Sequence, residues 1–435
     1  KTDEEGAFDY QVRNAAGDSS ESNMEGATFA VSCKNLYLVP RHPDGEVAVP
    51  PFNTWATAAT NVSDLLPYCG NGTDISVADG LHMMKEGVKF TCAVTLHGTN
   101  RAETAAFKRD DKATIAHMFN FSVAGSTMTC LSVSNANCNT TQNFGSGVTI
   151  VRGHVENCIF AHGQGCLLGA ENSTVIDCVI TDSTGGDGEP TGFWQRGDDA
   201  FASNCVITAN RETYYAAGSV RIDGGVFTHC QVTKNKMSND GTAGCENGGI
   251  VLVKGVVSET LIAENTCNGG AAGIHFAPAA STDTGVVVNC TVVSNSINKT
   301  AAGGLLLNTA GTLYMTNTIF YGNVSRQLDG TKVEVTKEWH QVNAASKLIA
   351  SHCVLDRIDD LNQLAGCSAT DCFYADPKFR NVAKGDYRVR PSSPCVFAGV
   401  GLPDAATDLN GRKRRKVQPT IGCYEAGYGM MLIVR

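Results

Sequence analysis

An alternation of apolar and polar positions recurs along the central part of the chain. Four copies of it read "SNCVITAN" at 203–210, "THCQVTKN" at 228–235, "NCTVVSNS" at 289–296 and "TNTIFYGN" at 316–323. In each copy a Cys or Thr is followed two positions later by an apolar residue, which is typical of a strand with one buried face. Across the chain this position is occupied, at spacings of 20 to 30 residues, by Cys158, Cys178, Cys205, Cys230, Thr260, Cys290 and Thr318.

An Asn and a second short strand complete the repeating unit. The Asn follows the Cys or Thr by five positions, and we expect it to end the strand because Asn tolerates left-handed backbone and hydrogen-bonds its own turn. The second strand reads Gly-Gly-Ile/Leu-x-Leu, as in "GGIVL" at 248–252 and "GGLLL" at 303–307. Equivalent positions of successive units are expected to stack, so that a ladder forms from Asn210, Asn235, Asn265, Asn295 and Asn323.

This unit predicts the fold class. No helical pattern separates the strands, and one unit cannot bury its own apolar face, so the units must stack. Several short strands in each unit therefore predict an all-β protein, a right-handed parallel β-helix solenoid with coils about 4.8 Å apart. A leucine-rich horseshoe is the competing repeat fold. It is disfavoured because the Leu-x-x-Leu-x-Leu frame is missing.

The flanks of the repeat are expected to cover the open ends of the solenoid, because open sheet edges promote aggregation. The stretch at 52–66 has apolar residues at helical spacing and predicts an N-terminal capping helix, with Asn53 or Thr54 as its N-cap. The chain divides into a linker or the end of a preceding segment at 1–32, an N-terminal cap and first coils at 33–148, central coils at 149–330, and last coils with a C-terminal cap at 331–435.

Composition and charge narrow the class of protein. The net charge of −9 argues against nucleic acid, which binds to basic faces. No stretch approaches the roughly 18 apolar residues of a transmembrane helix. The 18 cysteines indicate either disulfides formed in an oxidising compartment or a set of buried thiols, and both alternatives stay open. Eight Asn-x-Ser/Thr sequons are compatible with secretion.

Four segments resemble a known family. They read "TWATAATNV", "ISVADG", "DPKF…GDYRVRPSSPCVFAG" and "DLNGR…PTIGCYE". They are similar to the bacterial secreted β-helix proteins that carry a choice-of-anchor Q domain, within the pectate-lyase-like superfamily. The resemblance spans residues 35–426. It implies export and attachment to the cell surface, but it does not imply one activity, because a fold alone does not set function.

The C-terminal signature departs from the family's pattern at three positions. Cys395 stands where a small residue is usual, and Thr420 stands where an Asp is usual. The family's Gly-Ala-Tyr-Glu reads Gly-Cys-Tyr-Glu here, with Cys423 in place of Ala. Set against the family, the two cysteine departures imply a local disulfide between Cys395 and Cys423.

The second strand of the unit supplies candidate chemistry on its outward face. The residue between its two inward apolar residues points outwards, and this column reads Leu167, Trp194, Arg221, Val251, His275 and Leu306. The next outward position adds Arg196 and Asp223. A sugar polymer can lie across several rungs of such a face. Trp194 and Arg196 are predicted to bind substrate, because Trp stacks on sugar rings and Arg holds uronate carboxylates in bidentate fashion.

The reaction that suits these residues is β-elimination on an acidic polysaccharide. A base removes the proton next to the uronate carboxylate, and a cation or Ca²⁺ stabilises the charge that develops. The candidate catalytic residues are Arg221, His275 and Asp223, with Arg221 or His275 as the base or the stabiliser. The alternative is that these side chains are solvated decoration on a long solenoid.

Carboxylates are concentrated in the segment at 182–203, and three interpretations of it stay open. Asp187, Asp198 and Asp199 are candidate ligands of a Ca²⁺ ion, which prefers hard oxygen ligands. The segment also suits an acid pair of the inverting glycosidase type, or a solvated loop. Its "GDDA" resembles the Gly-Asp-Asp of polygalacturonases, but the other motifs of those enzymes are missing, which argues against that activity.

Two classes of function follow from these observations. The first is a secreted or cell-surface protein that contacts a polysaccharide or cell-envelope glycan and acts on acidic glycans as a lyase or glycoside hydrolase. The second is a non-catalytic surface adhesin or structural solenoid, which the lack of a complete catalytic signature favours. The basic run "GRKRRKV" at 411–417 either contacts an anionic polymer or forms an exposed loop.

Overall fold

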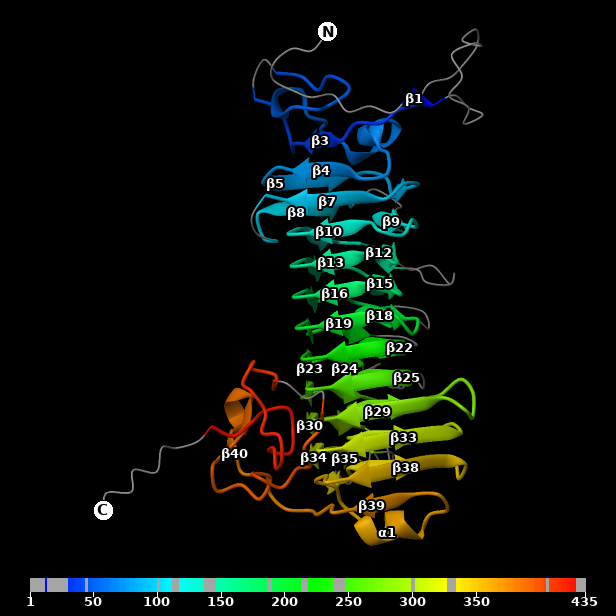
Figure 1. The fold of residues 1–435 in the computed structure, drawn as a ribbon, viewed down its shortest axis with the longest axis vertical. Coiled ribbons are helices and arrows are strands. Elements are labelled where there is room, and N and C mark those ends of the chain that lie inside the picture. Colours follow the sequence, from blue (N-terminus) through cyan, green and yellow to red (C-terminus); the bar gives the residue numbers. More distant parts are fainter. Residues whose placement is uncertain are drawn as a thin grey trace, which may run out of the picture.

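The chain forms an elongated solenoid of stacked parallel coils (Figure 1). A computed structural model describes residues 12–13, 30–43, 46–99, 102–111, 117–136, 146–185, 190–212, 218–237, 247–298, 302–326, 334–403 and 407–427. The predicted all-β parallel β-helix is confirmed. Within the described residues, no helix has the length and apolar character needed to cross a membrane.

The largest of the three main sheets, called here the long sheet, takes two strand segments from most coils. Its first row holds β6 (Val88–Phe90), β9 (Phe119–Phe121), β12 (Ser146–Val151), β15 (Cys166–Glu171), β18 (Phe193–Arg196), β22 (Val220–Thr228), β25 (Ile250–Ser258), β28 (Ile274–Phe276), β32 (Leu305–Leu307) and β37 (Trp339–Gln341). β22 and β25 continue into the second row, which holds β3 (Asn35–Leu38), β4 (Thr73–Val77), β7 (Val94–Gly98), β10 (Thr127–Thr129), β13 (His154–Glu156), β16 (Thr174–Ile176), β19 (Phe201–Ser203), β29 (Thr284–Val288), β33 (Gly311–Thr316), β38 (Ser346–Ser351) and β39 (Ser368–Thr370).

Two further sheets complete the coils. The ten-stranded sheet holds β5 (Gly80–Met84), β8 (Ala105–Arg109), β11 (Ser132–Ser134), β14 (Ile159–Ala161), β17 (Val179–Thr181), β20 (Val206–Thr208), β23 (Gln231–Thr233), β26 (Leu261–Ala263), β30 (Thr291–Val293) and β34 (Ile319–Tyr321). The short sheet holds β21 (Arg211–Glu212), β24 (Lys236–Met237), β27 (Thr266–Cys267), β31 (Ser296–Ile297), β35 (Val324–Arg326) and the antiparallel β36 (Glu334–Thr336). Two antiparallel pairs lie outside these sheets: β1 (Val12–Arg13) with β2 (Ala30–Val31), and β40 (Phe379–Asn381) with β41 (Asp386–Val389).

The recurring apolar position of the sequence forms a column inside the solenoid. Ile180 pairs in register with Phe160 on one side and Ile207 on the other, and all three side chains are buried. The cysteines two residues earlier are also buried, as expected for the buried face of the strand. Equivalent residues thus stack on one another along the solenoid, and each coil buries the apolar face of its neighbours.

Asn residues form a second interior column, here called the Asn ladder, which confirms the predicted ladder. Each side-chain amide donates to the side-chain oxygen of the Asn one coil further on, at 2.9–3.0 Å. The same amide nitrogen donates to a backbone carbonyl of the preceding coil, at 2.9–3.3 Å. Its fully buried members are Asn210, Asn235, Asn265, Asn295 and Asn323.

The predicted reason for these asparagines is wrong. Left-handed backbone occurs at the residue before each of them, for example at Lys234 and Glu264. The Asn itself points inwards, where its amide satisfies backbone groups of the turn that would otherwise be buried without partners. Its carboxamide, rather than its tolerance of left-handed backbone, therefore accounts for its recurrence.

Glu338 ends the Asn ladder. Its buried carboxylate accepts hydrogen bonds from the Asn323 amide at 2.6 Å, the Gly322 N–H at 2.8 Å and the Tyr374 hydroxyl at 3.3 Å. A carboxyl group has acceptor oxygens in both of its protonation states, so it can accept the hydrogen bonds of the last donors in the column. Burial is the main cause that raises the pKa of Glu338, to about 7.

The described cysteines are free thiols, which corrects the predicted disulfide. Sixteen cysteines are described and none is bonded to another. Cys395 accepts a backbone hydrogen bond from Ile421 at 3.0 Å, and Cys423 lies two residues further on, where its N–H donates to the Thr291 hydroxyl at 3.0 Å. The backbone pairing therefore places Ile421, not Cys423, beside Cys395. For these residues the buried-thiol alternative is the correct one.

Two short 3₁₀ helices replace the single helix predicted at 52–66. They are η1 (Trp55–Thr57) and η2 (Val62–Tyr68), and the predicted Thr54 is the N-cap of η1. Val62 and Leu65 belong to the same buried cluster as the first coils. The chain between the two helices forms a bridge with β3 through Ala59, and this extended pairing interrupts a continuous helix.

The C-terminal part of the chain, residues 372–427 and called here the return segment, runs back along the side of the solenoid (Figure 1). It carries β40, η3 (Val382–Lys384) and β41, and it follows α1 (Ile358–Gln363) and β39, which lie at the end of the coils. Its apolar residues pack on outward residues of the ten-stranded sheet in a separate buried cluster: Leu261, Ala263, Val293, Ile319, Val354, Phe379, Tyr387, Val389, Cys395, Ile421, Cys423 and Ala426. The return segment therefore gives the solenoid a second core outside the coils.

We predict that Asn235→Ala destabilises the protein by about 2–4 kcal/mol, because it leaves buried groups of Asn210 and Ile207 without partners. Chemical denaturation of the variant and the parent protein measures this difference in the free energy of unfolding. Asn381→Ala is the matched control, since Asn381 is exposed. Equal effects of the two substitutions would contradict a structural role for the ladder.

We also predict that Glu338 makes stability depend on pH. Its pKa rises from an ordinary value of 4.5 to about 7 on folding, so its stabilising contribution is full below the ordinary value and is lost as the pH rises through 7. Relative to Glu338→Gln, which does not titrate, the parent protein should lose stability across this window. Other titrating groups cancel in this difference. A difference that stays constant with pH would refute the assignment.

Candidate functional site

The long sheet brings the predicted column together on its outer face. Its register pairs Trp194 with Arg221, Arg221 with Val251, Val251 with His275, and His275 with Leu306. Arg221 and His275 are therefore two rungs apart, as predicted. The positions follow from in-register stacking, which places residues far apart in sequence at a fixed spacing of about 4.8 Å.

The first rung of the predicted column is wrong. Trp194 pairs with Gly169, whereas Leu167 is buried and lies two residues earlier on β15. The segment "CLLGAE" of β15 lacks the Gly-Gly pair that begins the later strands. The repeat could therefore not be aligned reliably at this rung. The predicted position lies two residues before the correct one, on the same side of the strand.

Three predicted residues form one polar cluster, called here the Trp194 cluster. The Asp223 carboxylate accepts a hydrogen bond from the Trp194 indole nitrogen at 2.7 Å. It also accepts from Nε of Arg221, at 2.9 Å and 3.0 Å to its two oxygens. The guanidinium carbon of Arg221 lies 5.5 Å from the centre of the Trp194 ring. One carboxylate thus orients both the aromatic ring and the cation.

Arg221 has hydrogen-bonding capacity left over. Its bonds to Asp223 use only Nε, and its two terminal nitrogens make no hydrogen bond to a described residue. The Arg221 side chain is 31% exposed and the Asp223 side chain is 16% exposed. The paired terminal N–H groups are the part of a guanidinium that binds a carboxylate in bidentate fashion.

His275 lies in the same outward column as Trp194 and Arg221, but unlike them it is buried. It is only 6% exposed, and neither ring nitrogen has a hydrogen-bond partner among the described residues. Burial lowers the pKa of His275 to about 4, so the ring is neutral at neutral pH. The structure therefore places His275 behind the surface of the face, although its position in the column is as predicted.

The next outward position forms a column of alternating charge. Glu171 pairs with Arg196, Arg196 with Asp223, and Asp223 with Lys254 in the sheet register. The predicted binding residue Arg196 is exposed and lies one rung from Asp223. Opposite charges on neighbouring strands stabilise such a column. Arg196 lies two residues after Trp194 on β18, so the two side chains share one face.

The predicted Ca²⁺ ligands are only partly covered by the structure. Asp198 and Asp199 lie between β18 and β19, and the Asp198 carboxylate is 2.7 Å from the Lys254 ammonium. Asp187 lies outside the described residues. Among the residues that are described, no three His, Cys, Asp or Glu side chains group to hold a metal ion. Binding of Ca²⁺ stays a prediction.

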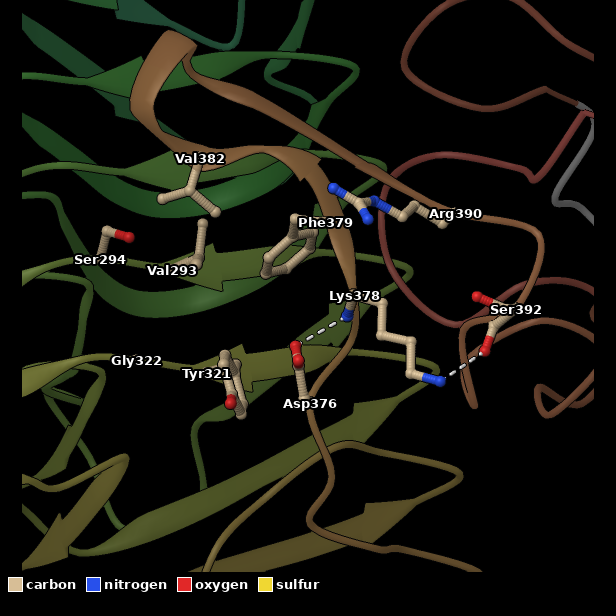
Figure 2. Close-up of a pocket in the computed structure, with 10 residues that line it drawn as sticks. All are labelled: Val293, Ser294, Tyr321, Gly322, Asp376, Lys378, Phe379, Val382, Arg390 and Ser392. Atoms are coloured by element: carbon tan, nitrogen blue, oxygen red, sulfur yellow. Dashed lines mark hydrogen bonds between the residues drawn. The ribbon is translucent and has the colours of Figure 1, made fainter.

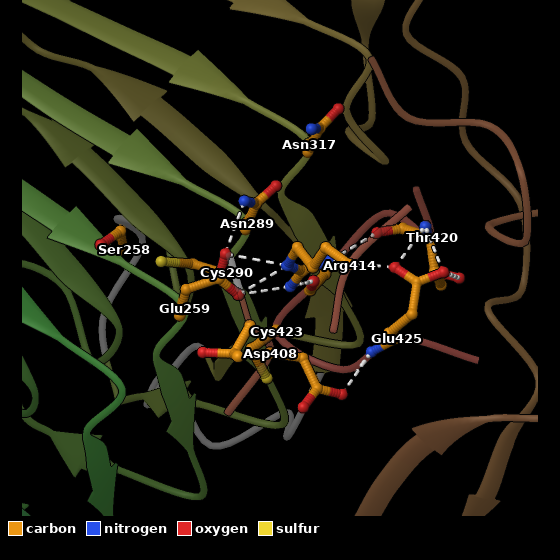
Figure 3. Close-up of polar contacts among 12 residues, drawn as sticks. Ser258, Glu259, Asn289, Cys290, Asn317, Asp408, Arg414, Thr420, Cys423 and Glu425 are labelled. Carbon is orange, nitrogen blue, oxygen red and sulfur yellow. Dashed lines mark hydrogen bonds and ion pairs between the residues drawn. The ribbon is translucent and has the colours of Figure 1, made fainter. Parts of the chain in front are cut away.

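The basic run at 411–417 contains one buried residue, Arg414 (Figure 3). Its Nε donates to the Glu259 carboxylate at 2.8 Å and 2.9 Å, and its terminal nitrogens donate to the carbonyls of Thr420 at 3.1 Å and Gly422 at 2.6 Å. Arg414 therefore ties the return segment to the solenoid. The exposed-loop interpretation fits residues 411–413 and 416–417 of the run, but not Arg414.

Two carboxylates that sequence reasoning missed complete this network. Glu259 occupies a left-handed corner of the solenoid where the next coils have Asn289 and Asn317. Asp408 accepts hydrogen bonds from three backbone N–H groups of the return segment, at 2.7–2.9 Å. Burial raises the pKa of Glu259 to about 7, and the Arg414 guanidinium opposes that rise. The same corner of other coils holds Asp177, His229 and His352, so no signal in the sequence singled out Glu259 as the partner of Arg414.

Comparison with known proteins supports the fold and goes no further. The chain matches no protein-family model, and no curated protein matches it, so the resemblance to choice-of-anchor Q domain proteins stays a prediction. The solved structure of pectate lyase Pel9A is similar at 13% identity and a TM-score of 0.56, covering 91% of this chain and 97% of the lyase chain. A rhamnogalacturonan lyase is similar at 11% identity and a TM-score of 0.41, covering 90% of this chain and 99% of that one.

We predict that Arg414→Met destabilises the protein by about 3–5 kcal/mol, because it leaves the Glu259 carboxylate buried without a countercharge. Denaturant unfolding measures the loss, and hydrogen exchange should show the return segment opening first. Lys416→Met is the control, since it removes an exposed cation of the same basic run. If both variants unfold alike, Arg414 does not anchor the segment.

Proposed function

We propose that this protein binds an acidic polysaccharide across the outer face of the long sheet. The Trp194 ring stacks on a sugar, and Arg221 holds the carboxylate of a uronate residue. The observation that carries the proposal is the orientation of Arg221. Asp223 accepts hydrogen bonds from Nε of Arg221. The two terminal nitrogens of Arg221 have no hydrogen-bond partner among the described residues, so they can bind a ligand.

The Trp194 cluster is organised before a ligand arrives. Asp223 bonds both Trp194 and Arg221, so neither side chain has to lose much rotamer freedom on binding. Binding sites that are already ordered have higher affinity for this reason. Arg196 on the neighbouring column extends the basic character of the face by one rung, which suits a polymer that carries repeated carboxylates.

Binding without catalysis is supported by the states of the candidate bases. His275 is buried and neutral, and Asp223 already accepts bonds from two partners. Arg221 is paired with Asp223 through its Nε. The three predicted catalytic residues therefore include no exposed, unpaired base. This arrangement is the one expected of a glycan-binding or adhesive solenoid.

A lyase on acidic glycans is the second candidate. Arg221 favours it, because a guanidinium that holds the uronate carboxylate also stabilises the charge formed when the neighbouring proton is removed. The candidate requires a base other than the buried His275. Export to the cell surface and membership of the choice-of-anchor Q group are part of the proposal and rest on the sequence resemblance.

We predict that Arg221→Met and Trp194→Ala each weaken binding of polygalacturonate by about tenfold or more, because each removes a direct contact worth over about 1.4 kcal/mol. Isothermal titration measures the affinity, with a neutral galactan as the control ligand. Arg211→Met is the control variant, since Arg211 is an exposed cation on the short sheet. Unchanged affinity in both site variants would overturn the proposal.

The same preparations separate the two candidates. The unsaturated uronate formed by β-elimination absorbs ultraviolet light, so each protein is incubated with polygalacturonate and alginate, with and without Ca²⁺. Product that forms with the parent protein and disappears in Arg221→Met would establish the lyase. Binding without product, and without new reducing ends, would establish the binder.

A further inference from the structure

A cavity of about 470 Å³ lies between the return segment and the ten-stranded sheet (Figure 2). We call it the side cavity. β30 and β34 supply one wall through Val293 and Tyr321, and the return segment supplies the other. The Trp194 cluster lies on the long sheet, so the two sites occupy different sheets of the solenoid. The volume falls in the range of small-molecule sites, which is roughly 300–1,000 Å³.

Two cations line the side cavity without a carboxylate partner among the described residues. The Lys378 ammonium donates to the Ser392 carbonyl at 3.1 Å, and Arg390 donates through one terminal nitrogen to the Arg380 carbonyl at 3.2 Å. Both side chains are exposed. The two cations outnumber the one carboxylate of the lining, Asp376, so the side cavity is locally positive in a protein with a net charge of −9, which favours an anion.

The rest of the lining suits a sugar ring. Tyr321 is half-buried and packs against Tyr374, with ring centres 5.6 Å apart. Phe379 and Val382 add apolar surface, and Val382 is 47% exposed at the rim. Aromatic and apolar side chains cover the non-polar face of a sugar, while the edge of the ring needs polar partners.

Asp376 supplies a polar partner on the same wall. One of its carboxylate oxygens accepts from the Lys378 backbone N–H at 2.8 Å, which leaves capacity for sugar hydroxyls. Burial of Tyr321 is the main cause that raises the pKa of its hydroxyl, and the negative charge of Asp376 raises it further. The Tyr321 hydroxyl therefore stays protonated and able to donate at neutral pH.

We propose that the side cavity is a second glycan site, which binds one uronate residue of an acidic oligosaccharide. Lys378 and Arg390 hold the carboxylate, Asp376 accepts from hydroxyl groups, and Tyr321 and Val382 cover the apolar face of the ring. The inference shares its ligand class with the proposed function, but it stands on different residues. Two sites on different sheets would let one molecule hold two segments of polymer, which raises the avidity for a polymer above that for a short oligosaccharide.

The test uses digalacturonate as the probe and the Trp194→Ala/Arg221→Met protein as the background, so that only the side cavity remains. Titration calorimetry should still detect binding in this background. Adding Lys378→Met and Arg390→Met should weaken that binding by about tenfold or more. The control is the same background with Arg380→Met and Lys384→Met, which removes two exposed cations of the same segment that do not line the cavity.

The outcomes distinguish the two proposals. Loss of all binding in the background, with binding intact in the parent, would overturn the side cavity and leave the Trp194 cluster supported. Background binding that the Lys378 and Arg390 substitutions do not change would also overturn it. The Trp194→Ala/Arg221→Met protein could also bind digalacturonate as tightly as the parent protein and lose that binding when Lys378 and Arg390 are substituted. This result would support the side cavity and refute the proposed function at the Trp194 cluster. Thermal unfolding of every variant confirms that each protein is folded.

Discussion

In-register stacking of buried polar groups is the constraint on which the rest of this structure depends. A solenoid turns its backbone sharply several times in each coil, and every turn buries N–H and C=O groups that no single coil can pair. The Asn ladder meets this need, because each side-chain amide donates to a backbone carbonyl of the coil before and to the Asn of the coil after, as Asn235 does. The ladder runs in one direction and therefore requires an acceptor at its end, which Glu338 provides.

The same stacking makes the outer faces regular enough to carry a binding site. Residues about 27 positions apart, such as Trp194 and Arg221, become neighbours on adjacent rungs. Their exact relationship is then set by a local contact, the shared Asp223 carboxylate. A repeating scaffold supplies the spacing, and one non-repeating carboxylate supplies the orientation. This division explains how a solenoid with few recurring charged residues can present a specific polar cluster.

The return segment adds a feature that no repeat contains. It covers outward residues of the ten-stranded sheet and converts them into a second core. A buried ion pair between Arg414 and Glu259 holds it there, and such pairs favour one register over others because any slip leaves charge unpaired. The side cavity exists only because this segment lies against Val293 and Tyr321.

The sequence by itself determined the fold class, the interior columns and the sharing of one face by Trp194, Arg221 and Asp223. These follow from a period-two alternation and a repeat length, which are local properties of the chain. Only the tertiary structure decided that His275 is buried, that Trp194 pairs with Gly169, and that Cys395 and Cys423 are free thiols. It also decided where the return segment lies and that Arg414 meets Glu259, 155 residues away. Contacts of this kind form between segments that do not belong to the same sequence repeat. The repeat pattern along the chain therefore cannot predict them.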